Sequence, residues 1–268
     1  MAATASLKKP QSLIQLLITS LKVINKNFAN LILTIFIVIC LVITAMLLLF
    51  LIYYLFIFLN IVNINFIYTY NFIWKSFGSI VYFIIAVIAQ ILLINVFFKS
   101  QINFKENLQA IKKYFWGIFC LTIILQLIFM FFTLPIYVGI FLLALKNIIL
   151  GILSFTLGII LAVLIVSYVV FSPFILIDKN IGCIAAIKQS IALTKNKLAN
   201  IILKIIFLSI ILIILNILST YLLPLYILGK MYFLASLLGI ILFLLMILLT
   251  FAYLFTMYQD YKTLKNVS

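Results

Sequence analysis

The chain offers few side chains that could carry out chemistry. It has three acidic residues, Glu106, Asp178 and Asp260, and eighteen lysines, with no arginine and no histidine among 268 residues. A histidine-based catalytic triad and an HExxH zinc site are therefore excluded, and no apolar segment contains paired carboxylates for acid–base work. The eight glycines do not form a phosphate-binding loop. We expect a protein that is not an enzyme, with no catalytic residue, no bound metal and no cofactor.

Asp178 has the most informative surroundings of the three acids. It lies in FSPFILIDKNIGCIAAIKQSIALTKNK, residues 171–197, where Pro173 ends an apolar run. Either Asp178 or Asn180 is well placed as the N-cap of the helix that follows, accepting hydrogen bonds from its first free amides. The carboxylate also offsets Lys179 and the positive end of the helix dipole. A structural role therefore accounts for this isolated acid.

Two glutamines lie deep in apolar sequence. Gln90 and Gln126 are near the middle of separate apolar segments, at depths that differ by about one helical turn. A polar group in hydrocarbon needs a partner, so we expect these side chains to hydrogen-bond across neighbouring helices, with a substrate contact as the alternative. Ser154 and Gly158 have the small-xxx-small spacing that lets two membrane helices pack closely.

Composition places the chain in a membrane. Hydrophobic residues make up 69% of the sequence and charged residues 8%, which leaves too little polar surface for a water-soluble domain. Six charge-free intervals lie between the lysines, each longer than the roughly 20 apolar residues that cross the hydrocarbon core. We predict an all-α integral membrane protein, with one membrane domain over residues 1–268. Its six transmembrane helices are predicted at Leu31–Leu59, Phe77–Phe98, Phe115–Leu134, Ile149–Phe174, Ile201–Leu222 and Tyr232–Phe255.

The distribution of lysine predicts the orientation, because cytoplasmic loops are enriched in lysine. With one span in the interval 27–74, fifteen lysines lie on one side and only Lys75, Lys146 and Lys230 on the other. Two spans in that interval would give seven against eleven. We therefore expect one span there and both termini in the cytoplasm. Lysines facing the anionic inner leaflet explain the net charge of +15 without a nucleic-acid partner.

The apolar residues in the connections predicted to be cytoplasmic recur with a helical period. In SLIQLLITSLKVINKNF, residues 12–28, five apolar residues beginning with Leu13 share one face, and Gln15, Thr19, Lys22 and Lys26 share the opposite one. Two later stretches repeat the spacing of the last four apolar residues. We interpret the three stretches as amphipathic helices that lie in the membrane surface. Segments 20–33 and 190–203 also share Ser, Ala and Asn at matched positions. The matched sets are Leu17, Leu21, Ile24 and Phe28 in the first stretch, Phe104, Leu108, Ile111 and Phe115 in the second, and Ile187, Ile191, Thr194 and Leu198 in the third.

These matches predict three parallel repeats of about 85 residues, each a surface helix followed by a two-span hairpin. The repeat units are 12–98, 103–178 and 180–258, followed by a cytoplasmic tail, 259–268. Outer connections are expected at 65–76, 134–141 and 219–232. The alternative is that the chain has no repeat, because amphipathic connecting helices in any membrane protein would match one another loosely.

The stretch around Asp178 resembles the hallmark of a broad group of bacterial six-span membrane proteins. That hallmark is an aromatic–proline–aliphatic span end, an acid, a glycine, and then a helix with alanine, serine and lysine. The segment FTMYQDYKTLKN, residues 255–266, is similar to the ending of the same group. The hallmark is carried here by Pro173, Phe174, Asp178, Gly182, Ala186, Ser190 and Lys195.

The group includes the membrane domain found ahead of some glycerophosphodiester phosphodiesterases, and related stand-alone inner-membrane proteins. Lys179 and Asn180 depart from it, because a second acid often follows the first in the group. The resemblance implies a membrane module without hydrolase activity, since three acids and no histidine cannot build the metal-dependent site of the phosphodiesterases.

We therefore expect a non-enzymatic protein of the bacterial plasma membrane that acts on its cytoplasmic face. Its partners would be membrane lipids of the anionic inner leaflet or a membrane protein. The alternative function is a transporter or flippase of an apolar or lipid-like solute, with Gln90 and Gln126 as its intramembrane polar pair. The candidate residues of the family motif are Pro173, Asp178, Gly182 and Ser190.

Overall fold

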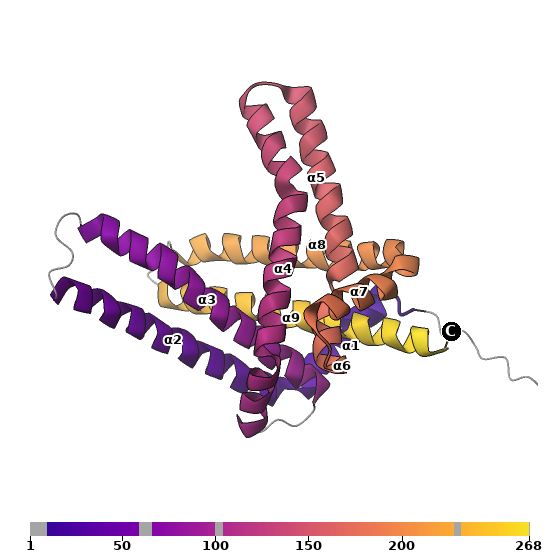
Figure 1. Ribbon diagram of the computed structural model, residues 1–268, viewed down its shortest axis with the longest axis horizontal. Helices are drawn as coiled ribbons and strands as arrows, with labels where there is room; N and C mark the ends of the chain where they lie inside the picture. The colour runs from indigo at the N-terminus through magenta and orange to yellow at the C-terminus, as the bar shows by residue number, and fades with distance from the viewer. Residues whose placement is uncertain (1–9, 59–65, 100–103, 228–231, 268) are drawn as a thin grey trace, which may run out of the picture. The chain divides into compact units, whose positions relative to one another are not determined.

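The computed structural model describes residues 10–58, 66–99, 104–227 and 232–267, and nearly all of them are helical. In chain order the helices are α1 (Leu13–Lys26), α2 (Phe28–Phe58), α3 (Phe66–Phe98), α4 (Phe104–Ala144), α5 (Ile148–Val169), α6 (Ser172–Lys179), α7 (Cys183–Thr194), the short 3-10 helix η1 (Lys195–Lys197), α8 (Leu198–Ile227) and α9 (Tyr232–Val267) (Figure 1).

Six of these helical stretches are long and apolar enough to cross a membrane. The prediction of six spans is confirmed, and α2 supplies the span expected in the interval 27–74. Leu59 and Lys230, named in the predicted spans and topology, lie outside the described residues. The six stretches are Phe28–Ile52, Gly78–Phe98, Lys105–Ala144, Ile148–Lys179, Cys183–Thr220 and Leu238–Leu264.

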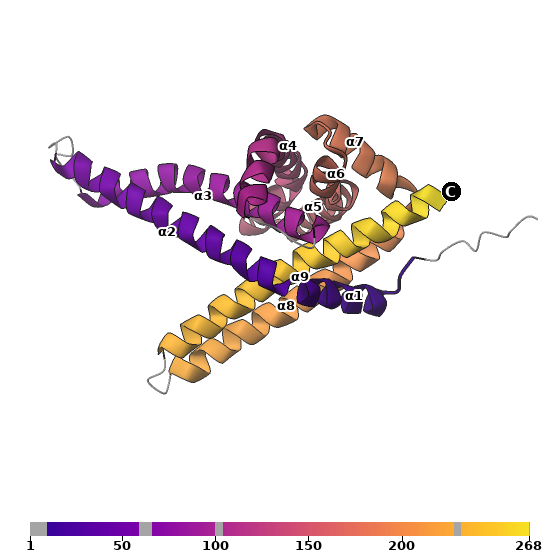
Figure 2. The same cartoon turned by 90° about the horizontal axis from the view of Figure 1, so that it is seen from below.

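The chain divides into two compact units, Met1–Lys26 with Cys120–Ser268, and Asn27–Phe119. Within the second unit, α2 and α3 pack side by side as a hairpin. Within the first unit, α8 and α9 form another hairpin and α1 lies along α9 (Figure 2). Helix α7 packs on α5 and α6 in the same unit.

Helices extend further into the predicted outer connections than the sequence indicated. The expected connection 134–141 is part of α4, so Pro135 lies inside that helix, and α8 continues beyond Pro224 to Ile227. Helix α3 begins at Phe66, inside the expected connection 65–76. The physical reason is that backbone groups in apolar surroundings find partners most readily within a helix. A single proline removes only one of those backbone bonds.

The three expected surface helices are not formed alike. The helices α1 and α7 are separate elements, each ending just before the apolar helix that follows. The stretch expected as the second surface helix instead continues into its span without a break, as the first turns of α4.

Glycines bring α4 and α5 close together, as the spacing of Ser154 and Gly158 predicted. A Cβ atom on Gly158 would lie 2.5 Å from Ile136 Cγ1, and one on Gly139 would lie 2.6 Å from the backbone N of Phe155. The Ser154 hydroxyl donates a hydrogen bond of 2.8 Å to the carbonyl of Pro135. This hairpin therefore depends on side chains that are absent or small.

Adding one methyl group at Gly139 should destabilise the hairpin. Gly139→Ala forces a Cβ against backbone atoms that cannot move independently, and we expect a loss of about 1–3 kcal/mol in the free energy of unfolding. Gly78→Ala is the matched control, because a Cβ there meets no atom within 4 Å. Unfolding in mixed detergent–SDS micelles, followed by circular dichroism, measures both. Equal stability of the two variants would contradict the close contact.

Candidate functional site at the lysine-rich helix ends

Asp178 binds the far end of the chain rather than its own neighbours. Its Oδ2 atom accepts a hydrogen bond of 2.6 Å from the Tyr258 hydroxyl and forms an ion pair of 2.7 Å with Lys262 Nζ. Both partners belong to α9. Lys179, which the sequence suggested as a partner of the acid, donates instead to Gln189.

The expectation that Asp178 or Asn180 caps the next helix is wrong. Asp178 lies inside α6, and Asn180 ends that helix in the left-handed conformation that asparagine tolerates, with φ 51°. The N-cap of α7 is Gly182, and no side chain caps it. The carboxylate instead meets a lysine and a phenol of α9 on one oxygen atom, and the ion pair with lysine places charge on both partners of the bond.

Pro173 positions two phenylalanines against α9. Helix α5 ends at Val169, and Pro173 lies in the first turn of α6, where its missing N–H has no helical partner to lose. The Phe174 ring stacks on Tyr258 with centroids 6.0 Å apart, and Phe171 lies 6.0 Å from Tyr261. The aromatic–proline–aromatic motif thus packs α6 on the same face of α9 that binds Asp178.

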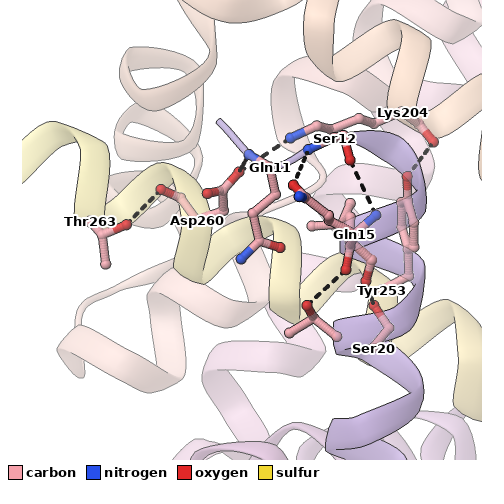
Figure 3. A network of polar contacts seen from close by, with 10 residues as sticks. Gln11, Ser12, Gln15, Ser20, Lys204, Tyr253, Asp260 and Thr263 are labelled. Atoms are coloured by element: carbon pink, nitrogen blue, oxygen red, sulfur yellow. Dashed lines mark hydrogen bonds and ion pairs between the residues drawn. The ribbon is translucent and has the colours of Figure 1, made fainter. Parts of the chain in front are cut away.

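Asp260 joins three helices. Its Oδ2 atom lies 3.2 Å from Lys204 Nζ on α8 and accepts a hydrogen bond of 3.1 Å from the backbone N–H of Gln11, just before α1. Figure 3 shows Lys204 and Gln11 converging on this carboxylate. The Tyr253 hydroxyl donates to the Lys204 carbonyl at 3.2 Å, which fastens α9 to α8 a second time.

The beginning of α1 carries a capping box that we did not identify in the sequence. The Ser12 N–H donates to Gln15 Oε1 at 3.2 Å, and the Gln15 N–H donates to Ser12 Oγ at 3.3 Å. The letters SLIQ before an apolar run are the sequence signal for this motif. Asp260 was also missed as a site residue, and its rarity as one of three acids among eighteen lysines was the signal that could have revealed it.

The third acid makes an ion pair within the second unit. Glu106, in the first turn of α4, lies 3.2 Å from Lys99 Nζ, and both side chains are exposed. Close by in sequence, the Asn95 amide donates to Asn107 Oδ1 at 3.5 Å, and both asparagines are buried. Each acidic residue of the chain therefore pairs with a lysine.

Ser190 and its counterpart Ser20 each hold a connecting helix on the second helix of a hairpin. The Ser190 hydroxyl donates to the Tyr168 carbonyl on α5 at 2.7 Å, and the Ser20 hydroxyl lies 3.3 Å from Thr256 Oγ1 on α9. The Asn107–Asn95 contact joins α4 to α3 in the same way. In the register that matches Leu17 to Phe104 and to Ile187, the counterparts of Ser20 are Asn107 and Ser190.

Buried positions follow the same register along the chain. Five buried side chains among residues 12–49 of the first repeat have buried counterparts in the third, and three of the five also in the second, although the residue types often differ. Asn27 and Leu49 are buried without a buried counterpart. The offsets found by matching letters thus also match which side chains are buried. The matched buried residues are Leu16, Ser20, Ile24, Leu31 and Thr34 in this part of the first repeat and Ala186, Ser190, Thr194, Ile201 and Lys204 in the third. In the second repeat, Asn107, Ile118 and Leu121 are the buried counterparts of Ser20, Leu31 and Thr34.

The structure leaves two other predicted features open. Gln90 is a half-buried residue of α3 and Gln126 an exposed residue of α4, in different compact units, so their pairing stays a prediction. Gly182 takes an extended conformation with φ −67° and has open space where a Cβ would lie. Neither space nor backbone strain requires glycine there, although glycine is well tolerated at an N-cap.

The described residues form six helical stretches long and apolar enough to cross a membrane, which indicates a multi-pass membrane protein, and the ion pairs of the three acids lie near helix ends. No protein-family model matches the chain, and no curated protein or solved structure shows significant similarity to it. The resemblance to the six-span bacterial group therefore stays a prediction. Chemically, the site offers lysine ammonium groups held in place by carboxylates, an arrangement suited to binding charged groups.

Neutralising Asp178 should destabilise the packing of α6 on α9. Asp178→Asn removes the charge from two short hydrogen bonds, and we expect a loss of about 1.5–3 kcal/mol in the free energy of unfolding. Glu106→Gln is the matched control, because its ion pair is exposed and should contribute only about 0–1 kcal/mol. SDS-induced unfolding of both variants measures the difference. A loss for Glu106→Gln as large as that for Asp178→Asn would count against the structural role of Asp178.

Proposed function

We propose that this chain is a non-enzymatic protein of the bacterial plasma membrane that acts through its lysine-rich cytoplasmic face. Its contacts would be with the anionic inner leaflet and, through it, with a membrane-protein partner. Support comes from the ion pairs of the three acids, which leave no carboxylate side chain of the chain without a lysine. Both termini would be cytoplasmic, because the lysines nearest to them belong to the lysine-rich side of the predicted topology.

The observation that carries this proposal is the three-sided surface of α1. Leu16, Ser20 and Ile24 are buried, on a helix that packs along α9. A second side exposes apolar residues, and the third exposes polar residues that include two lysines. The exposed apolar residues are Ile14, Ile18 and Leu21, and the lysines are Lys22 and Lys26.

Such a helix suits the boundary between head groups and acyl chains. The apolar side can enter the boundary while the lysines reach anionic head groups. Helix α7 has equivalent exposed residues, because Ile184 and Ile191 are the counterparts of Ile14 and Leu21 in the register of the repeats. Lysines 188 and 195 lie beside them. Two helices of the chain therefore present the same kind of surface.

The matched burial and matched contacts also support three parallel repeats, each a connecting helix followed by a two-helix hairpin. In each repeat the connecting helix would dock on the last helix of the repeat before it. Helix α1, the connecting helix of the first repeat, docks on α9 of the third. We infer that α1 links the first repeat to the third through this contact.

Removing lysine charge from α1 should weaken its association with anionic lipid. A lysine near an anionic surface contributes about 1 kcal/mol, so Lys22→Gln with Lys26→Gln should lose about 2 kcal/mol. The measurement is lipid mass spectrometry of protein extracted from membranes together with its surrounding lipid by a membrane-scraping polymer. We expect a lower ratio of anionic to zwitterionic lipid than around the wild type.

Lys146→Gln is the control, because Lys146 is an exposed lysine in the turn between α4 and α5, which the predicted topology places on the outer side. An unchanged lipid ratio in the double variant, or an equal fall in the control, would contradict the proposal. The same proteins reconstituted in vesicles test the alternative, transport of an apolar or lipid-like solute. Lipid scrambling above that of protein-free vesicles would replace our proposal with that alternative.

The alternative has some structural support in two open apolar grooves. One, of about 430 Å³, lies between α2 and α3 and includes Val42 and Met46. The other, of about 490 Å³, lies between α8 and α9 and includes Leu212 and Asn216, the counterparts of Val42 and Met46 in the register of the repeats. Lipid chains would fill such grooves in any bilayer-embedded hairpin, so we place the cytoplasmic-face proposal first.

A further inference from the structure

An open cavity of about 580 Å³ lies where α1 begins beside α8. Residues 10–14 form one wall, and Asn200, Lys204 and Phe207 of α8 form the other. The lining combines polar groups with apolar side chains. The cavity lies at the lysine-rich end of α8, within the first turns of that helix.

The charge in this cavity is not required by the packing of the helix. Lys204 is only 1% exposed and pairs with Asp260, so both charges have lost most of their hydration, at a cost that an ion pair does not always recover. At the matched positions of the other two repeats the buried residues are Thr34 and Leu121, which carry no charge. Of these three matched positions, the one in the third repeat holds a buried charged group, and such groups in membrane proteins usually serve function.

The local electrostatics favour an anion. Lys204 Nζ lies 4.7 Å from the centroid of the Tyr261 ring, and Lys197 Nζ lies 5.3 Å from the same centroid. Asp260 pairs with Lys204, and Lys197, on the same tyrosine ring, leaves a net positive charge beside the cavity. Ser12 and Asn200 add hydrogen-bond donors to the cavity wall. A phosphate group is the anion that such a set of donors suits.

A second observation indicates that the ligand also donates hydrogen bonds. Gln11 Oε1 is buried and, among the described residues, has no hydrogen-bond partner, although Gln11 lines the cavity. A buried acceptor without a partner costs free energy. A hydroxyl or ammonium group on the ligand would satisfy it. Leu13, Ile14 and Phe207 supply an apolar wall for an acyl chain or a glycerol backbone.

We propose that this cavity binds the head group of one anionic phospholipid, with its phosphate beside Lys204 and Asn200 and a head-group hydroxyl at Gln11. The phosphatidylglycerol class has all of these features. The proposal rests on the proposed function, because it requires this end of the chain to face the anionic leaflet. The cavity would be a discrete lipid-binding site on a surface that otherwise attracts anionic lipids only through its overall positive charge.

The test is native mass spectrometry of the full-length protein, delipidated in mild detergent and titrated with defined ligands. Phosphatidylglycerol should give a single one-to-one adduct at the lowest concentrations. Diacylglycerol, which lacks the phosphate, and glycerol 3-phosphate, which lacks the acyl chains, should each bind at least about tenfold more weakly. Equal binding of either compound, or the absence of a discrete phosphatidylglycerol adduct, would overturn the proposal.

Two variants locate the adduct. Ile14→Trp places a large ring in the cavity from a residue that is 66% exposed, so folding should be unaffected. Its matched control is Ile206→Trp, on α8 but outside the cavity lining. We expect about tenfold weaker binding for Ile14→Trp and unchanged binding for the control. An adduct that persists unchanged in Ile14→Trp would show that the lipid binds elsewhere.

The second variant removes both charges together, so that neither is left buried and unpaired. Lys204→Met with Asp260→Asn should also weaken the adduct about tenfold, and unchanged affinity would overturn the role of Lys204. Failure of this site is distinguishable from failure of the proposed function. The Lys22 and Lys26 variants test the surface of α1 in membranes, whereas the adduct in detergent tests the cavity alone.

Discussion

Charge neutralisation at the helix ends is the constraint on which this structure depends. The chain has eighteen lysines and only three acids, so each carboxylate is a scarce partner for several positive charges. Asp178 and Asp260 bind lysines on helices far away in the sequence, whereas Glu106 binds Lys99 across a short connection. Because apolar helices have no hydrophobic driving force to associate in lipid, these few polar contacts have a large share in deciding which helix ends meet.

The lysine-bearing end of α9 is where most of these contacts converge. Along this end, Tyr253 and Asp260 hold α8, Thr256 meets Ser20 of α1, and Tyr258 meets Asp178 of α6. The aromatic rings of α9 pack on two phenylalanines of the segment around α6 between the hydrogen bonds. One helix end therefore organises elements from the beginning, the middle and the end of the chain. A ligand that binds beside Lys204 would be placed next to this junction.

The spans could be predicted from the sequence, because hydropathy is a local property. Each span contains enough apolar residues to be recognised without information about the rest of the fold. Helix ends were predicted less well, since a segment such as 134–141 contains proline and aromatic residues and yet stays helical in apolar surroundings. The partner of Asp178 could not be deduced, because Lys262 is 84 residues away and nearer lysines were equally suitable by charge. Ser190 was identified through its motif and repeat, but its acceptor is a backbone carbonyl that no side-chain pattern reveals.

The docking of α1 on α9 can be tested directly by disulfide cross-linking in native membranes. Ser20→Cys and Thr256→Cys would be combined in a chain whose own cysteines, Cys40, Cys120 and Cys183, are replaced by serine. The two hydroxyl oxygens lie 3.3 Å apart, so mild oxidation should link the two positions within one chain. Lys22→Cys with Thr256→Cys should stay unlinked, because Lys22 is on an exposed side of α1. Equal cross-linking of both pairs, or of neither, would show that α1 does not close the chain on α9.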